Sequence, residues 1–234
     1  MLSIVIPTLN EENYLPLLLK SIKQQDFNEE YEIIVADNCS RDTTAKIAKE
    51  YGCKVVLGGL PPEGRNEGAR IAKGELILFL DADVILPPHF LEKVLEEFKI
   101  RKLGAASFPL HPKKNKLDKI IFRVYNLYTR LVQNLWPIAA QAILVRREIH
   151  QIIGGFDEKI KIGEDHDYVI RAAKFDKFGF LSQFVLSSSR RFERDGRVRT
   201  YLKYFLIGVY MLISGPVESD IFKYRFGHYK KSSK

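Results

Sequence analysis

The stretch that decides the fold is Glu75-Leu76-Ile77-Leu78-Phe79-Leu80-Asp81-Ala82-Asp83. Its first six residues are mostly apolar, which predicts a short strand that is buried on both faces of a parallel sheet. Two carboxylates follow where the strand leaves the core, and open α/β sheets bind their ligands at this end of a strand. An Asp-X-Asp pair can hold a divalent cation together with phosphate and water oxygens. The alternative is a pair of turn-forming aspartates before Pro87, because so short a motif often occurs by chance.

The sequence before this stretch alternates between strands and helices. Strands are expected at 2–6, 31–36 and 54–57, and helices at 10–22, 43–51 and 64–73. Pro7 is expected to end the first strand, and Ser40 or Asp42 to cap the second helix. The alternation predicts right-handed crossovers and a mostly parallel sheet. Asp37 and Asp81 would then face one crevice, because each follows the carboxyl end of a strand.

The pattern is less regular after Pro88. Helices are expected at 90–98, 117–135 and 165–175, and strands at 105–108 and 141–145. The 117–135 helix is amphipathic, because its apolar positions leave Lys119, Arg123, Asn126 and Arg130 on the other side. The apolar positions are Ile120, Val124, Leu127, Tyr128, Leu131 and Leu135. The fold class expected from both halves is α/β, with a mostly parallel central sheet flanked by helices.

The composition places the chain among globular proteins. With 46% hydrophobic and 28% charged residues, it matches neither a disordered segment nor an integral membrane bundle. Its net charge of +8 favours anionic partners such as nucleotide phosphates, anionic lipids or nucleic acid. Nucleic acid is the least favoured, because it does not explain acidic residues at strand ends. Cys39 and Cys53 form no metal-ligand spacing or disulfide framework, and the first strand begins at Leu2, so we expect no signal peptide and a cytoplasmic location.

Polar residues also follow the first two strands. Thr8 and Asn10 after the first strand, and Asp37 after the second, could read the edge of a base and a ribose. Neither the Gly-X-Gly-X-X-Gly dinucleotide signature nor the Walker phosphate loop is present. The charge of a diphosphate must then be met in another way, and a cation on Asp81 and Asp83 would meet it. Asp37 as a turn residue or helix-cap neighbour is the alternative.

Six short segments, taken in order, resemble the family-two inverting glycosyltransferases, which carry the nucleotide-diphospho-sugar transferase fold known as GT-A. The segments are 4–12, 35–43, 65–70, Asp81-Ala82-Asp83, Gly154-Gly155-Phe156-Asp157-Glu158 and Gly163-Glu164-Asp165-His166-Asp167. The resemblance covers roughly residues 2–195, and the full set is far more specific than any one segment. It implies a single GT-A-type domain at 1–195, in which about 1–105 bind the nucleotide-sugar and about 106–195 face the acceptor. Residues 196–234 would form a basic and apolar C-terminal segment, a helical appendage to that domain.

The resemblance also implies roles for particular residues. It assigns nucleotide binding to Pro7, Thr8, Asn10, Glu11, Asp37, Arg65 and Asp81. Asp83 would be the principal ligand of a Mg²⁺ or Mn²⁺ ion, with Asp81 beside it. Gly155, Phe156 and Asp157 would form the floor of the acceptor site, although an ordinary turn would also explain these residues.

An arginine-rich stretch begins at Arg190 and Arg191 and continues through Arg194, Arg197 and Arg199. Guanidinium groups bind phosphate oxygens in pairs, so this cluster could grip the donor diphosphate or a lipid phosphate on the acceptor side. A solvated basic face explains the same residues equally well.

Glu164 and Asp165 carry the implied chemistry. An acceptor hydroxyl that displaces a nucleotide diphosphate from a sugar carbon must lose its proton, and a carboxylate within reach can be the base. The resemblance gives this role to Asp165, and Glu164 would orient it or hold the acceptor. The alternative is electrostatic, since acids in the first turn of a helix stabilise its dipole by ~0.3–1 kcal/mol each.

The expected function is a metal-dependent inverting transfer of a sugar, with a UDP-sugar as the favoured donor and a hydroxyl of a lipid-linked or cell-envelope glycan as acceptor. The alternatives are a GDP-mannose or UDP-glucose transferase that acts on a polyprenyl or dolichyl phosphate, and a non-catalytic nucleotide-sugar binding protein. A sugar nucleotidyltransferase is disfavoured, because no Gly-rich loop follows the first strand. Processive synthases of the family carry a Gln-X-X-Arg-Trp motif, which is absent around Gln183, so a single transfer is expected.

The apolar run 204–217 contains no charged residue and is shorter than the ~20 residues of a spanning helix. Basic residues flank it, including Arg199 and Lys203, so it could lie in a membrane interface. A core helix or a dimer helix is the alternative, and the oligomeric state is left open. A basic surface beside an apolar segment favours peripheral attachment to the cytoplasmic membrane face.

Overall fold

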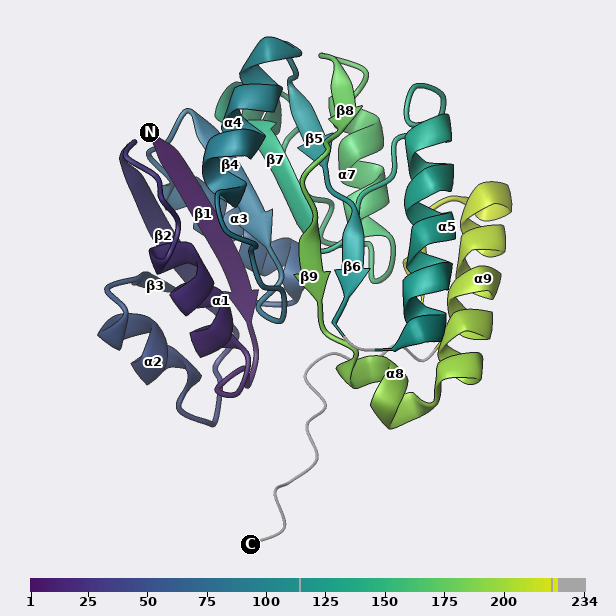
Figure 1. Ribbon diagram of the computed structural model, residues 1–234, viewed down its shortest axis with the longest axis horizontal. Coiled ribbons are helices and arrows are strands. Elements are labelled where there is room, and N and C mark those ends of the chain that lie inside the picture. The colour runs from purple at the N-terminus through teal and green to yellow at the C-terminus, as the bar shows by residue number, and fades with distance from the viewer. Residues whose placement is uncertain (114, 220, 223–234) are drawn as a thin grey trace, which may run out of the picture.

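The computed structural model describes residues 1–113, 115–219 and 221–222, and the structural statements that follow refer to these residues (Figure 1). Residue 220 and residues 223–234, which belong to the expected C-terminal segment, lie outside them.

A seven-stranded sheet forms the centre of the molecule, with the strand order β3-β2-β1-β4-β7-β5-β8. Its strands are β1 (Leu2–Thr8), β2 (Tyr31–Asp37), β3 (Lys54–Leu57), β4 (Leu76–Leu80), β5 (Ala105–Ser107), β7 (Ala142–Arg146) and β8 (Phe178–Phe180). β7 runs antiparallel to both of its neighbours, whereas the other described pairs in this sheet are parallel. A second, parallel pair joins β6 (Leu110–Pro112) to β9 (Val185–Ser187). The expected mostly parallel α/β sheet is confirmed.

Helices cover both faces of this sheet and make three layers (Figure 1). The helices are α1 (Leu15–Lys23), α2 (Thr44–Glu50), α3 (Pro61–Ile71), α4 (Phe90–Ile100), α5 (Lys116–Val132), α6 (Arg147–Ile152), α7 (Glu164–Ala172), α8 (Arg190–Asp195) and α9 (Arg197–Ser214). Successive side chains of a strand point to opposite faces, so Ile4 and Ile6 of β1 pack in the cluster that contains α1 and α4. Val5 packs on the other face, in the cluster that contains α3 and α7.

The first strand does not end at Pro7, as the sequence predicted, but continues to Thr8. β4 pairs with β1 only from Leu2 to Val5, so Pro7 lies beyond that ladder and pairs only with Ala36 of β2. A proline is tolerated where a strand is locally at an edge, because its missing N–H is not needed there.

Two predicted helix starts also move. α1 begins at Leu15 rather than at Asn10, since Asn10 has a φ of 55°, in the left-handed region where a right-handed helix cannot begin. α3 begins at Pro61 rather than at Gly64, because the fixed φ of proline suits the first turn of a helix. Asp42 is the residue that contacts the second helix, where its carboxylate accepts from the N–H of Thr44 at 2.9 Å.

Short elements of the second half were not predicted from the sequence. They are β6, β8, β9, α6 and α8. Strands of three residues and helices of six are too short to show a hydrophobic period, and tertiary contacts determine where they form.

The amphipathic helix α5 has the sidedness that its sequence predicts, but its apolar side faces solvent. Its exposed apolar residues are Leu117, Ile120, Val124, Leu127, Tyr128 and Leu131. The side that packs on the body carries the fully buried Asp118 and Thr129, and Asn126 there bonds the backbone of Leu110 in both directions. Lys119, Arg123 and Arg130, which the sequence placed away from the apolar residues, are exposed. α9 exposes a second apolar set, which comprises Val198, Leu202, Tyr204, Phe205, Leu206, Val209, Leu212 and Ile213.

Candidate active site

Functional side chains gather at the edge where the parallel strands end. Asp81 follows the last residue of β4, and Asp37 is the last residue of β2. Because β7 is antiparallel, its amino end lies at this same edge, and the N–H of Asp81 donates to the carbonyl of Gln141 at 2.8 Å. These groups therefore lie together at the carboxyl ends of the strands, the edge at which open α/β sheets bind ligands.

Arg65 organises the first group of carboxylates. Its side chain comes from α3, is buried, and donates through Nη2 to Asp81 at 2.9 Å. Its Nη1 lies 3.0 Å from Glu164 Oε1 and 3.2 Å from Asp165 Oδ1, at the start of α7. One guanidinium group thus contacts both Asp81, which was expected at the donor site, and Asp165, which was expected to act as the base.

A stack of aromatic rings supports Arg65 from below. The guanidinium lies over the ring of Phe156, with 5.2 Å between its central carbon and the ring centroid. Phe156 in turn stacks on Tyr168 at 4.0 Å and meets Phe79 edge-on at 5.0 Å. The sequence suggested that Phe156 contributes to the floor of the acceptor site. Its side chain is only 2% exposed, because it is part of the core that supports Arg65, so it is not placed to touch an acceptor.

Asn66 anchors the 155–157 turn beside Arg65, a role that was not expected from the sequence. Its amide accepts from the N–H of Phe156 at 2.8 Å and donates to the carbonyl of Phe156 at 2.9 Å. Gly155 has a φ of 76°, and a Cβ there would lie 2.6 Å from Asn66 Oδ1, so the position requires glycine. Asp157 is exposed and accepts from the N–H of Lys159, a turn contact that leaves it open to solvent.

Burial changes the acidity of two carboxyl groups in this cluster. Burial raises the pKa of Asp165 above its ordinary value, and the neighbouring Glu164 and Asp81 add to the increase, whereas Arg65 opposes it. Burial also raises the pKa of Asp81, with Asp83 and Glu164 adding to it and Arg65 again opposing. A carboxylate with a raised pKa takes up a proton more readily, as a general base must.

Gln141 is a site residue that sequence analysis missed. It has a φ of 62°, which is rare for a residue with a side chain. Its carbonyl accepts from Asp81, and its backbone also hydrogen-bonds Asp165, where the contact lowers the pKa of that carboxyl. Its side-chain oxygen is buried without a hydrogen-bond partner among the described residues. Positive φ at a glutamine leaves no mark in a single sequence, so no signal could have identified it.

Arg190 organises the second group of carboxylates. It follows β9 and binds Glu11 through two nitrogen atoms, at 2.8 and 2.9 Å. Its Nε lies 2.9 Å from Asp83 Oδ2, and the ring of Tyr14 lies 4.7 Å from the guanidinium carbon. The structure therefore brings Arg190, which we expected on the acceptor side, to the carboxylate that was expected to bind the metal. Arg191 extends the other way, to the hydroxyl of Tyr204 on α9.

Asp37 is held in a network that links the first two strands. Its carboxylate accepts from the hydroxyls of Thr8 and Ser40, at 2.8 and 2.6 Å, and from the N–H of Ser40 at 2.9 Å. Asn10 completes the network, since its N–H donates to the hydroxyl of Ser40. These residues are brought together at the expected nucleotide edge, next to Pro7.

A divalent cation would fit the chemistry of this donor set. The two groups hold five carboxylates, Glu11, Asp81, Asp83, Glu164 and Asp165, against two guanidinium groups. The excess of negative charge would repel a diphosphate unless a cation came with it. Within residues 1–113, 115–219 and 221–222, no three His, Cys, Asp or Glu side chains are grouped to bind a metal alone. Asp81 and Asp83 therefore suit an ion that is completed by phosphate oxygens and water.

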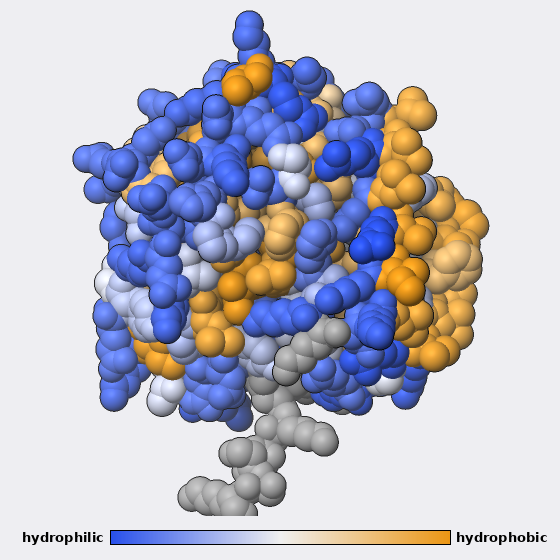
Figure 2. Space-filling model, in the orientation of Figure 1, coloured by the Kyte–Doolittle hydropathy of each residue, from blue (hydrophilic) through white to orange (hydrophobic). Residues whose placement is uncertain are grey.

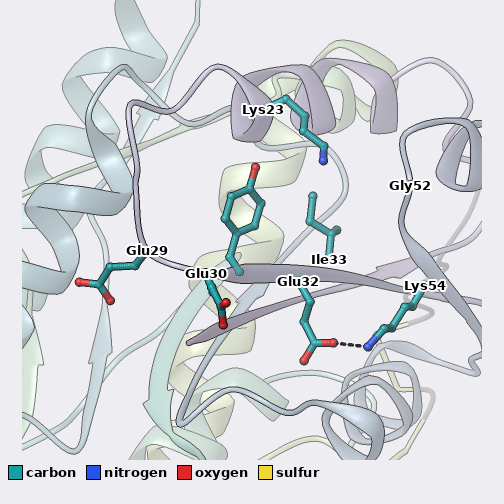
Figure 3. A pocket seen from close by; sticks show the side chains of 8 residues that line it. Lys23, Glu29, Glu30, Glu32, Ile33, Gly52 and Lys54 are labelled. Atoms are coloured by element: carbon teal, nitrogen blue, oxygen red, sulfur yellow. Dashed lines mark hydrogen bonds and ion pairs between the residues drawn. The ribbon is translucent and has the colours of Figure 1, made fainter.

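A pocket of about 410 Å³ lies at the opposite end of the sheet, at the start of β2 (Figure 3). Lys23, Tyr31 and Ile33 line it, and Glu32 pairs there with Lys54. Glu32 also accepts from Ser3 and from the N–H of Lys73, so its contacts are structural. The pocket holds none of the groups described above.

Removal of the Arg65 guanidinium should destabilise the fold. Arg65→Ala leaves three partly buried carboxylates without their buried partner, which should lower the free energy of unfolding by about 3 kcal/mol near neutral pH. The pKa values of Asp81 and Asp165 are already raised in the folded protein, so stability from these groups is present at low pH and lost as the pH rises. The difference in free energy of unfolding between the unmodified chain and Arg65→Ala should therefore grow from acid to neutral pH, as measured by urea titration.

Arg70→Ala is the matched control on α3, because Arg70 makes only an exposed pair with Glu67. It should change the free energy of unfolding by less than about 1 kcal/mol. Equal urea midpoints of unfolding for Arg65→Ala and Arg70→Ala would show that Arg65 does not hold the carboxylates together.

Comparisons with known proteins agree with this geometry. The family model described as glycosyl transferase family 2 matches residues 3–147. A Haemophilus influenzae protein described as an uncharacterised glycosyltransferase is 29% identical over 197 residues, which are 76% of this chain and 64% of that protein. The poly(ribitol-phosphate) β-N-acetylglucosaminyltransferase TarS of Staphylococcus aureus is 28% identical over 193 residues, which are 73% of this chain and 32% of TarS. The chain thus spans between about a third and less than two thirds of these relatives.

Solved structures show the same fold. The crystal structure of residues 1–349 of S. aureus TarS with UDP-GlcNAc aligns with a TM-score of 0.66 at 25% identity, over 80% of this chain and 58% of that one. The Pyrobaculum calidifontis mannosyltransferase in complex with GDP-Man and Mn²⁺ aligns with a TM-score of 0.64 at 22% identity, over 80% of this chain and 56% of that one. Because the family model matches more than half of the residues and the architecture agrees, this chain belongs to glycosyl transferase family 2 and has a GT-A-type fold.

Proposed function

We propose that this chain transfers a sugar from a nucleotide diphosphate donor to a hydroxyl acceptor, with inversion at the sugar carbon and with Mg²⁺ or Mn²⁺ as cofactor. The observation that carries the proposal is the contact of one buried guanidinium with Asp81, Glu164 and Asp165. This contact holds Asp81, at the strand end suited to a donor diphosphate, next to Asp165, a carboxylate suited to deprotonate an acceptor. Holding both reactants in place is a large part of catalysis in a displacement of this kind.

A UDP-sugar is the favoured donor. The TarS structures that align with this chain at 25% identity were solved with UDP and with UDP-GlcNAc. The archaeal mannosyltransferase with GDP-Man and Mn²⁺ supports the divalent cation and keeps a guanosine donor as the alternative. In this chain Thr8, Asn10 and Asp37 would contact the base and ribose, from the edge where β1 and β2 end.

Asp81 and Asp83 would hold the cation against the donor. When bound, the ion would neutralise the diphosphate and stabilise the charge that develops on it as it leaves. Asp83 is paired with Arg190, so it would exchange that partner for the ion. Arg190 would then be released toward the diphosphate, where a guanidinium can form two parallel hydrogen bonds.

Asp165 would act as the base. The acceptor oxygen forms a bond to the anomeric carbon as the bond from that carbon to the diphosphate oxygen breaks. The acceptor proton passes to the Asp165 carboxylate, and the electron pair of the broken bond leaves with the nucleotide diphosphate. Arg65 opposes the rise in the pKa of Asp165 and so favours the ionised form that a base requires, and the backbone of Gln141 hydrogen-bonds the carboxylate. Glu164, on the same guanidinium, would orient Asp165 or hold the acceptor.

The acceptor is proposed to be a lipid-linked or cell-envelope glycan. A base would be unnecessary for a phosphate acceptor that is already ionised, so a buried Glu-Asp pair favours a hydroxyl. Relatives include a poly(ribitol-phosphate) glycosyltransferase and a 4,4'-diaponeurosporenoate glycosyltransferase of Staphylococcus haemolyticus, which is 37% identical over 107 residues. A phosphate acceptor and a non-catalytic sugar-nucleotide binding protein are the competing functions.

Calorimetric titration with UDP and with GDP, each with and without Mn²⁺, tests the donor site. We expect UDP to bind in a manner that depends on Mn²⁺, and Asp83→Ala to remove that dependence. Asp26→Asn is the control, because Asp26 is an exposed acid outside the site. Binding of UDP to the unmodified chain with the same affinity in the presence and absence of Mn²⁺ would contradict the proposed metal site.

Asp165→Asn should separate binding from chemistry. The amide keeps the size of the side chain but cannot accept the acceptor proton, so kcat should fall by about 10²–10⁴-fold. Affinity for UDP with Mn²⁺ should remain close to that of the unmodified chain. Turnover is measured as release of UDP in the presence of an acceptor, and an unchanged kcat would remove Asp165 from the role of base.

Arg190→Ala tests the exchange of partners at Asp83. Without the guanidinium, Mn²⁺ alone should bind more tightly, because Arg190 no longer competes with the ion for Asp83. UDP should bind more weakly when Mn²⁺ is saturating, because the diphosphate loses a guanidinium partner. Arg194→Ala on the same helix is the control, since Arg194 pairs with Asp195. Unchanged affinities for both ligands would contradict the exchange.

A further inference from the structure

The exposed apolar faces of α5 and α9 form one continuous surface. Figure 2 shows the hydrophobic colour concentrated on the flank where Figure 1 places these two helices. Val124, Leu127 and Leu131 of α5 are 64%, 59% and 73% exposed, and Leu202, Phe205 and Leu212 of α9 are 57%, 67% and 60% exposed. We call this surface the α5–α9 face. Apolar patches of this kind on a soluble surface mark a place where something docks.

The two helices are fixed side by side and point in the same direction (Figure 1). Asp118, near the start of α5, is fully buried and accepts from the hydroxyl of Tyr201 at 2.8 Å. It also lies 3.4 Å from the guanidinium of Arg197, the first residue of α9. These contacts set the two apolar stripes parallel, so they can meet one flat surface together.

The charges of the α5–α9 face suit an anionic surface. Lys116, Lys119 and Arg123 lie in the first half of α5, and Arg199 and Lys203 in the first half of α9. α9 contains no Asp or Glu, and the single acid of α5, Asp118, is buried and already paired. The cations are therefore concentrated in the first halves of the two helices, and Arg130 in the last turn of α5 donates to the carbonyl of Leu181. Basic residues beside an exposed apolar stripe are the pattern of helices that lie in a lipid headgroup region.

We propose that the α5–α9 face docks in the interface of an anionic lipid bilayer, with its basic end at the lipid phosphates. Among the described residues, no helix has the length and apolar content to cross a bilayer, so both helices would lie along it. A second copy of the chain suits the face less well, because this face offers no acid to meet its own cations.

Docking would place the bilayer beside the candidate base. Gly163 immediately precedes Glu164 and Asp165, and a Cβ on it would lie 2.3 Å from the Met211 side chain of α9. Val217, just beyond α9, pairs with Ile162 on the same segment. The glycan acceptor would then be presented by a membrane lipid, an extension that rests on the proposed function, whereas the docking itself does not.

Vesicle co-sedimentation of the full chain tests the docking without donor, metal or acceptor. We expect binding to vesicles that contain phosphatidylglycerol and much weaker binding to pure phosphatidylcholine, because the cations need an anionic surface. The double variant Leu131→Ser/Phe205→Ser should lose about tenfold or more in partitioning, since two large side chains no longer enter the bilayer. Its thermal unfolding should match that of the unmodified chain, because both positions are exposed.

Two matched controls make the result specific. Ile100→Ser removes an apolar side chain that is 72% exposed on α4, outside the α5–α9 face, and should leave partitioning unchanged. Lys119→Glu/Arg199→Glu should reduce binding to the anionic vesicles, whereas Lys46→Glu/Lys93→Glu on other helices should not.

Three results would overturn the proposal. One is a chain that stays in the supernatant with both kinds of vesicle, and another is equal partitioning of the Leu131→Ser/Phe205→Ser and Ile100→Ser variants. The third is a dimer of the unmodified chain in analytical sedimentation that becomes a monomer in the Leu131→Ser/Phe205→Ser variant, because the face would then join two copies. A chain that binds UDP normally but does not bind vesicles would refute only the docking proposal. A chain that binds vesicles but not UDP would refute only the proposed function.

Discussion

The Arg65 guanidinium is the contact on which the rest of the site depends. A buried guanidinium and three partly buried carboxylates are each costly to remove from water, and their close pairing is what makes the burial tolerable. The partners come from α3, from the end of β4 and from the start of α7, so one side chain joins the two halves of the fold. Phe156 and Tyr168 hold the guanidinium from below, and Asn66 fixes the turn that carries Phe156. The candidate site is therefore built on the core.

The site is arranged around an imbalance of charge. Two guanidinium groups face five carboxylates, and Arg190 occupies the position at Asp83 where a cation would be needed once a diphosphate arrives. Arg190 compensates the charge of Asp83 and Glu11. In the proposed function, the same arginine would exchange Asp83 for the donor diphosphate.

The second half of the chain links this edge to the molecular surface. β9 leads directly into Arg190, α8 follows it, and α9 continues along α5 with its apolar stripe outward. Met211 and Val217 then return to Gly163 and Ile162, beside the acidic pair at the start of α7. The described part of the C-terminal segment is thus packed against the start of α7 through specific contacts.

The sequence by itself determined the alternation of strands and helices, the buried strand before Asp81 and the polar residues at strand ends. These follow from short-range patterns, because period, capping and turn chemistry act within about ten residues. Only the tertiary structure decided which carboxylates share an arginine, since Arg65 and Glu164 are 99 residues apart and Arg190 and Glu11 are 179 apart. It also decided that Phe156 is buried, that Gln141 has a positive φ, and that the apolar side of α5 faces solvent. A hydrophobic period shows that a helix has an apolar side, but what that side meets depends on the packing of every other element around it.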